Sequence, residues 1–255
     1  MQNTLEFPGL LLLIDDRSAA FRATVAAAPS FDAPVPSCPG WTLADLVRHL
    51  GRGRRKAAAI VAAGPADAPP TDLGPEPPED RAALLAWLDE SVELLARTLR
   101  EAGPDRACWT WWGDSQSPST SGGVARHQVQ EVAVHTYDAQ LALGAPQPLP
   151  AVVALDGVEE FQFTCCATTT AWPHDPAVVD YHVVDGPTWR LRLGGDGARV
   201  TRLDPAAAPA EVDASASGTA SELVLAFYGR VPLESLKVEG DRRVFDQLIE
   251  WDPSA

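Results

Sequence analysis

Apolar residues recur at helical spacing through the first two thirds of the chain. Segments 4–28, 42–64 and 80–102 each carry Leu, Val and Ala three or four residues apart, and proline-rich loops separate them. Thr42 followed by Asp45 is a start signal for the second segment, and Pro29 follows the first. The pattern predicts long amphipathic helices joined by loops that cannot continue a helix.

Two further helices are expected after residue 120. The segment RHQVQEVAVHTYDAQLALG, residues 126–144, is rich in Ala, Val and Leu, and a further helix is expected over residues 151–171, ending at Pro173. Long helices with connections of this kind suggest an up-and-down four-helix bundle, whose core is a usual place for a metal or ligand site.

From about residue 178 the pattern changes. YHVVDGPTWRLRLGGDGARVTRL alternates apolar and polar residues between glycine turns, which indicates short strands. SELVLAFYGR is typical of a helix, SLKVEGD of a short strand and turn, and RRVFDQLIEW of a closing helix. We therefore expect an α plus α+β protein, with a helical bundle over residues 1–175 and a small α+β domain over 176–255. The boundary is expected between residues 173 and 178.

Composition limits the class of partner. The 255 residues are 45% hydrophobic and 22% charged, with a formal net charge of -15. This charge argues against nucleic acid or an anionic membrane as partner, because both attract basic proteins. The N-terminus has no basic leader, and no stretch approaches the roughly 18 apolar residues of a membrane helix. We expect a cytoplasmic monomer or homodimer, and the abundance of Ala, Arg, Pro and Gly hints at an actinobacterial source.

One predicted helix carries a row of titratable side chains. His127, Glu131 and His135 are four residues apart, so a helix presents them on one face. Glu and His at this spacing offer two metal ligands, and zinc requires a third from a neighbouring helix. His49, one of five histidines, lies in the apolar stripe of the second helix and would complete a His2Glu site with an open fourth position. Alternatively, His49 is a hydrogen-bonded core residue and the ExxxH spacing is a weak intrahelical pair.

Two motifs resemble a known family. CPGWTLADLVRHLG, followed later by ExxxHxxDA, resembles the mycothiol-dependent maleylpyruvate isomerase family, whose N-terminal bundle is related to the DinB-like metalloproteins. Gly218-Thr219-Ala220, LVLAFYGR and VEGD are similar to the family's small C-terminal domain, which has a sterol-carrier-like topology. The resemblance places His49, Glu131 and His135 on metal-ligand positions. It implies zinc as the metal, with other divalent ions as alternatives, and mycothiol as the thiol cosubstrate.

The resemblance implies an enzyme that activates a low-molecular-weight thiol. A Zn²⁺ ion with two neutral imidazoles and one carboxylate keeps a net charge of about +1, which favours a bound thiolate. A thiolate that adds to an electrophilic double bond, allows rotation and leaves again performs cis–trans isomerisation; if the adduct remains, the enzyme is an S-transferase. The alternatives are a metal-dependent hydrolase that uses a bound water and a non-catalytic carrier whose C-terminal domain binds an apolar ligand.

Four further residues are candidates for contact with substrate or thiol. Arg230, which resembles a recurring Gly-Arg position of the family, and His127 are the candidate catalytic residues, since arginine orients carboxylates by bidentate pairing. Arg52 and Trp112 are the candidate contacts with the thiol cofactor.

Each of these candidates has a plain structural alternative. The basic cluster of the second helix favours a solvated face, the tryptophans favour bundle packing, and His127 favours a rim position. The cluster comprises Arg52, Arg54, Arg55 and Lys56. Asp138 and Asp45, each about one turn from a histidine, either accept a ring N–H from that histidine or serve as surface or capping residues.

Overall fold

The computed structural model describes residues 5–204, 206 and 211–251, and the chain divides into two compact units. Unit 1 comprises Met1–Gly113 and Pro118–Leu149, and unit 2 comprises Asp114–Ser117 and Pro150–Ala255. No helix among the described residues combines the length and the hydropathy needed to cross a membrane.

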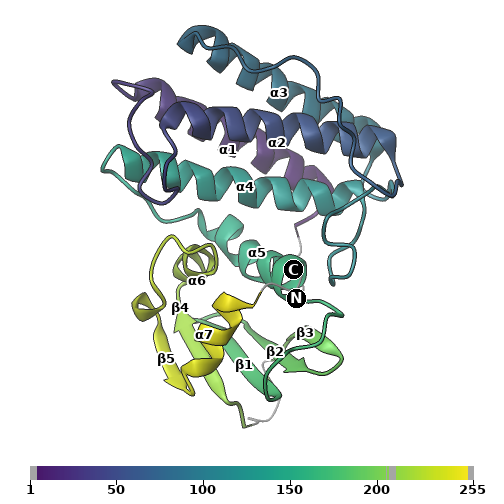
Figure 1. Ribbon diagram of the computed structural model, residues 1–255, viewed down its shortest axis with the longest axis vertical. Coiled ribbons are helices and arrows are strands. Elements are labelled where there is room, and N and C mark those ends of the chain that lie inside the picture. Colours follow the sequence, from purple (N-terminus) through teal and green to yellow (C-terminus); the bar gives the residue numbers. More distant parts are fainter. Residues whose placement is uncertain (1–4, 205, 207–210, 252–255) are drawn as a thin grey trace. The chain divides into compact units, whose positions relative to one another are not determined.

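Among the described residues, unit 1 contains four long helices that run side by side (Figure 1). They are α1 (Phe7–Ala27), α2 (Leu43–Ala63), α3 (Arg81–Ala102) and α4 (Ser121–Ala142). α2 packs mainly on α3 and α1 mainly on α4, and α2 also contacts α4. The predicted bundle is therefore confirmed, including the α2–α4 contact on which the proposed metal site depends.

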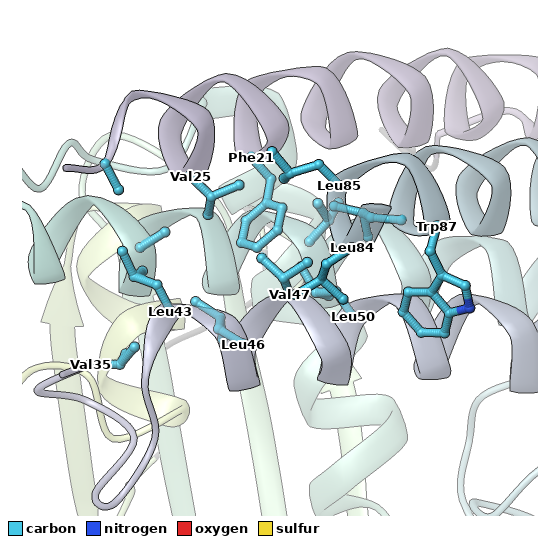
Figure 2. Close-up of a cluster of buried hydrophobic side chains, with 14 residues drawn as sticks. Phe21, Val25, Val35, Leu43, Leu46, Val47, Leu50, Leu84, Leu85 and Trp87 are labelled. Atoms are coloured by element: carbon cyan, nitrogen blue, oxygen red, sulfur yellow. The ribbon is translucent and has the colours of Figure 1, made fainter. Parts of the chain in front are cut away.

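A buried apolar cluster sets the rotation of α2 about its axis (Figure 2). Leu43, Leu46, Val47 and Leu50 of α2 lie in this cluster with side chains of α1 and α3 such as Phe21, Val25, Leu84 and Leu85. Burial of each large apolar side chain contributes roughly 1.5–3 kcal/mol. Because four such side chains hold one face of α2 inward, the direction in which the neighbouring His49 points is fixed as well.

Gly51 allows α3 to approach α2 closely. A Cβ atom at this position would lie 1.9 Å from Cζ3 of Trp87, a buried side chain of α3. The absence of a side chain at residue 51 is therefore a condition for the packing of these two helices.

The start of α2 is capped as predicted. The Thr42 hydroxyl accepts a hydrogen bond from the Asp45 N–H at 3.3 Å, and the Asp45 carboxylate accepts one from the Thr42 N–H at 3.0 Å. This reciprocal arrangement satisfies two backbone donors that the helix leaves unpaired. The hydrogen bonds from the Thr42 side chain and backbone, together with the nearby charge of Arg48, outweigh burial and lower the pKa of Asp45. Asp45 thus serves the cap, which was one of its two expected roles.

Unit 2 is a small α+β domain, as predicted. Its sheet has the order β3-β2-β1-β4-β5, with β1 and β4 parallel and the other neighbouring pairs antiparallel. The strands are β1 (Ala177–Val183), β2 (Thr188–Gly194), β3 (Gly197–Arg202), β4 (Ala214–Gly218) and β5 (Lys237–Gly240). The helices of the unit are α5 (Ala151–Phe161), α6 (Ala220–Phe227) and α7 (Arg243–Glu250), and α6 packs on β1 and β4.

The helix after residue 150 differs from its prediction in two ways. The units divide at Leu149–Pro150, whereas the sequence placed the boundary after this helix. The physical reason is that α5 packs on α6, and Glu159 accepts a hydrogen bond from Trp189 Nε1 of β2 at 3.1 Å. In addition, α5 ends at Phe161 and the chain continues as a π-helical turn over Gln162–Cys166 instead of running on to residue 171.

Candidate metal centre

Three side chains from two helices converge in unit 1. The Nε2 atom of His49 on α2 lies 3.5 Å from Oε2 of Glu131 on α4, and Nε2 of His135 lies 3.8 Å from the same oxygen. The three ligand atoms all lie within 4.8 Å of one another. Two atoms bound tetrahedrally to one zinc ion at about 2.1 Å are about 3.4 Å apart. The donor set therefore fits a shared divalent ion with small side-chain adjustments.

The ring of His135 is held from behind by a buried carboxylate. Its Nδ1 atom lies 2.8 Å from Oδ2 of Asp138, which is fully buried. The other Asp138 oxygen accepts a hydrogen bond from Ser37 Oγ at 2.6 Å. When Nδ1 carries the proton that Asp138 accepts, Nε2 keeps its lone pair and can bind a metal. The predicted ring N–H acceptor role of Asp138 is consistent with this geometry.

A second possible ligand group shares His135. Cys38, His135 and Asp138 also offer ligand atoms within 4.8 Å of one another, and Cys38 Sγ lies 3.6 Å from Asp138 Oδ2. Asp138 is already used by His135 and Ser37, whereas the group of His49, Glu131 and His135 leaves those hydrogen bonds intact. We therefore take His49, Glu131 and His135 as the candidate centre.

Glu131 carries a negative charge at neutral pH. Burial raises its pKa, but the hydrogen bond with His49 and the Coulomb interactions with His135, His127 and His49 outweigh burial and lower it to about 2. An ionised carboxylate is the form that binds a metal.

A buried cation lies near this carboxylate. Arg54 of α2 is only 1% exposed, and its Nη1 donates to the Gln128 backbone oxygen at 2.9 Å and to Gln128 Oε1 at 2.7 Å. Burial lowers the pKa of Arg54 to about 10, although the charge of Glu131 opposes that change, so the guanidinium remains charged at neutral pH. The sequence marks Arg54 only as a member of a basic cluster and gives no sign that it is a buried cation near Glu131.

The solvated-face interpretation of that cluster is wrong for two of its members. Arg54 and Arg55 are both buried, and Arg55 Nε donates to Ser91 Oγ of α3 at 2.8 Å. Arg52, by contrast, is exposed and pairs with Glu76 at 2.7 Å.

His127 lies beside the candidate ligands and against two tryptophans. Its Nε2 atom is 3.7 Å from Oε1 of Glu131, the carboxylate oxygen that the other two histidines do not face. Its ring centroid lies 5.8 Å from that of Trp111 and 5.3 Å from that of Trp112. Trp112 is buried, which supports a packing role. Its ring also lies against that of His127, the histidine next to Glu131.

A pocket of about 600 Å³ opens beside His49. It is lined by Trp41, Arg48, Arg52 and Lys56, together with Gly40, Asp45, Gly53 and Leu73. The Trp41 ring centroid lies 4.9 Å from that of His49. The predicted ligand contact Arg52 thus shares a pocket with a candidate metal ligand. Arg230 belongs to unit 2, where it follows α6 and its Nη1 donates to the Tyr228 backbone oxygen at 2.7 Å.

The bundle and the three converging side chains define a class: helical proteins with a candidate His2Glu metal centre between two helices. Comparison with family models makes the assignment specific. The model described as the mycothiol maleylpyruvate isomerase N-terminal domain matches residues 11–140, and the model described as the MDMPI C-terminal domain matches residues 152–247. The chain belongs to the mycothiol maleylpyruvate isomerase family.

Solved structures show the same fold over nearly the whole chain. The mycothiol-dependent maleylpyruvate isomerase matches with a TM-score of 0.61 and 17% identity, covering 92% of this chain and 93% of that one. A point mutant of that isomerase matches with a TM-score of 0.62 and 15% identity over the same shares. Identities this low show the fold and not the activity. No curated protein matches the sequence.

Proposed function

We propose that the chain is a metal-dependent enzyme that activates mycothiol for addition to a small electrophile, as a cis–trans isomerase or a thiol S-transferase. The observation that carries the proposal is the convergence of His49, Glu131 and His135 within 4.8 Å. Membership of the family and the structural likeness to the mycothiol-dependent maleylpyruvate isomerase support the choice of thiol.

The donor set is suited to zinc. Two imidazoles and one carboxylate are common ligands of catalytic zinc, and they leave one tetrahedral position for another molecule. When bound, a divalent ion would supply the positive charge that lowers the pKa of a thiol and favours the thiolate. The chain itself contributes an ionised Glu131 and an Asp138 that holds the His135 ring in one orientation.

The basic side chains of the pocket beside His49 favour the binding of an anionic or highly polar ligand. Arg52 and Arg48 pair with Glu76 and Glu79, whose side chains are 85% and 91% exposed. Exposed ion pairs of this kind contribute little, because water screens them. A carboxylate of the electrophile or a polar group of the thiol can therefore replace these partners, with Arg52 as the proposed contact.

His127 is the proposed catalytic side chain of this centre. His127 lies next to Glu131 and is positioned to hold or release a proton there, and Trp112 packs against its ring. Arg230 belongs to unit 2, and its catalytic role stays a prediction from the sequence, in which its planar guanidinium is suited to pairing with a carboxylate.

Metal analysis combined with a thiol titration tests the proposal. The purified protein should contain about one zinc per chain, and Glu131→Ala and His135→Ala should lose it, whereas Arg52→Gln should retain it. Addition of mycothiol to the Co²⁺-loaded protein should produce a sulfur-to-cobalt charge-transfer band. A native protein that binds no divalent metal would overturn the proposal, and metal binding without the thiol band would favour a hydrolase that uses water.

A further inference from the structure

The basic side chains that line the pocket beside the candidate metal centre differ in their partners. Two are arginines of α2 that carboxylates already neutralise: Arg48 pairs with Glu79 at 2.9 Å, and Arg52 pairs with Glu76 at 2.7 Å. The third is Lys56, which lies one turn further along the same face of the helix. Among the described residues, no carboxylate lies within ion-pair distance of Lys56. Lys56 is therefore the positive charge of this pocket that no acidic side chain compensates.

The ammonium group of Lys56 lies near an aromatic ring. Its Nζ atom is 6.0 Å from the centroid of the Trp109 ring. At this distance the attraction between a cation and the face of a tryptophan ring is weak, and the three N–H donors of the lysine remain suited to an anion. An anionic group that binds Lys56 displaces no carboxylate. A contact of the same group with Arg52, by contrast, replaces Glu76.

Gly53 leaves room between Lys56 and the candidate metal ligand His49. The three residues lie four and three positions apart, so they share one face of α2, and all three line the pocket of about 600 Å³. A Cβ atom at Gly53 would meet no atom within 4 Å. From His49 to Lys56 the helix axis advances about 10 Å, and Trp41 and Leu73 add apolar surface to the pocket. A small molecule can therefore lie over Gly53 with one end at His49 and the other at Lys56.

We propose that Lys56 binds the single anionic group of the electrophile, whose body lies over Gly53 and whose other end lies at the candidate metal centre. The pocket selects a monoanion, because a second anionic group would have to displace Glu76 or Glu79 from its arginine. The identification of this ligand with the electrophile rests on the proposed function. The binding of a monoanion at Lys56 does not, because it needs neither a metal nor a thiol.

Calorimetric titration of the full chain with three related ligands tests the proposal. 3-Phenylpropionate carries one carboxylate, benzylmalonate carries two on the same carbon, and 3-phenyl-1-propanol carries none. We expect saturable binding of 3-phenylpropionate at one site, about three- to fivefold tighter than binding of either other ligand, which is the upper range for an exposed ion pair. Lys56→Gln should bind 3-phenylpropionate as weakly as the alcohol. Lys56→Arg, which keeps the charge, and Lys237→Gln, which removes an exposed charge of unit 2, should bind it as the wild type does.

Two further variants test the geometry of the pocket. Gly53→Leu should abolish binding of 3-phenylpropionate, because the new side chain fills the space between His49 and Lys56. Gly53→Met repeats this experiment if Gly53→Leu does not fold by circular dichroism. Glu76→Gln should raise the affinity for benzylmalonate about three- to fivefold, because Arg52 then loses its carboxylate partner. Glu90→Gln is the matched control and should leave this affinity unchanged, because the partner of Glu90 does not line the pocket.

The zinc-free variant separates this inference from the proposed function. Glu131→Ala should lose zinc and still bind 3-phenylpropionate as the wild type does, so a failure of the metal proposal leaves the role of Lys56 standing. If Glu131→Ala instead loses the ligand, the carboxylate binds the metal and the proposal is overturned. The same holds if 3-phenylpropionate does not bind saturably, if Lys56→Gln binds it as the wild type does, if a folded variant filled at Gly53 still binds it, or if the wild type binds benzylmalonate more tightly.

Discussion

The Nδ1 atom of His135 lies 2.8 Å from Oδ2 of Asp138, whose other oxygen is 2.6 Å from Ser37 Oγ. A candidate metal ligand is thus tied to a fully buried carboxylate and through it to the loop before α2. This relationship makes Asp138 a positioning residue: it touches no metal in the proposed centre, but it orients the ring and makes it a stronger base.

Asp138→Asn should weaken zinc binding by about 10–100-fold, because partners behind a ligand typically contribute this much. The amide keeps the size of the side chain but not its charge. Competition with a chromophoric chelator measures the affinity. Ser37→Ala, which removes only the outer hydrogen bond, should have a smaller effect. Unchanged affinity in Asp138→Asn would show that the His135 ring is held by other contacts.

Arg54→Met should bind zinc more tightly although the fold becomes less stable. The charge of Arg54 is felt at Glu131 and therefore also opposes a cation bound there, so its removal should raise zinc affinity several-fold. The fold should lose about 1–3 kcal/mol, because the Gln128 oxygens lose their donor.

Arg55→Met is the matched control for this variant. Arg55 is also buried on α2, but its Nε bonds Ser91 of α3. Arg55→Met should therefore lower the free energy of unfolding without raising the affinity for zinc. Equal zinc affinities in both variants and the wild type would contradict the proposed electrostatic effect of Arg54.

Several features could be predicted because they depend on local spacing. The i, i+4 row of α4 and the Thr42–Asp45 cap follow from helix geometry alone, and the family motifs place His49 on a candidate metal-ligand position. That α2 and α4 lie next to each other was an assumption, because a sequence pattern marks an apolar face without showing which element covers it.

The features that were missed depend on distant contacts or on small residues. The assignment of α5 to unit 2 depends on its packing against α6, and the burial of Arg54 depends on Gln128 of another helix. β4 consists of the residues ASASG, which show no alternation of large apolar and polar side chains. Its place in the sheet comes from pairing with β1 and β5.

Two glycines of α2 should respond to alanine in opposite ways. Gly51→Ala places a methyl group 1.9 Å from Cζ3 of Trp87, so it should destabilise the fold by about 1–3 kcal/mol. A Cβ at Gly53 meets no atom within 4 Å, so Gly53→Ala should stabilise the helix by up to about 1 kcal/mol. Urea unfolding of both variants measures the two changes. Equal changes in the free energy of unfolding would mean that the α2–α3 contact accommodates the added methyl group without strain.

Shifting Trp87 or α2 should also disturb the site, because His49 lies two residues before Gly51. Gly51→Ala should therefore weaken zinc binding, whereas Gly53→Ala should not. A destabilised Gly51→Ala variant with unchanged zinc affinity would show that the two effects are separate.

Because of the cap of α2, the free energy of unfolding should depend on pH in the acidic range. The pKa of Asp45 is lowered in the folded protein, chiefly by the hydrogen bonds from Thr42. A group with a lowered folded-state pKa contributes fully above its unfolded value, about 3.9, and loses that contribution as the pH falls through the folded value. Asp45→Asn should therefore be less stable than the wild type at pH 7, and the difference should shrink below about pH 4.

Unfolding by urea at pH 7, 5, 4 and 3 measures this difference. Thr42→Ala, which removes the partner of Asp45, should lose about 1 kcal/mol at pH 7 and should flatten the dependence on pH in the same way. Asp67→Asn, in the exposed loop after α2, makes the same chemical change outside the cap and should leave stability nearly unchanged. The free energy of unfolding of Asp45→Asn could instead differ from that of the wild type by the same amount at pH 7 and pH 3. The carboxylate would then act through its shape rather than its charge, and the reciprocal cap would not account for the start of α2.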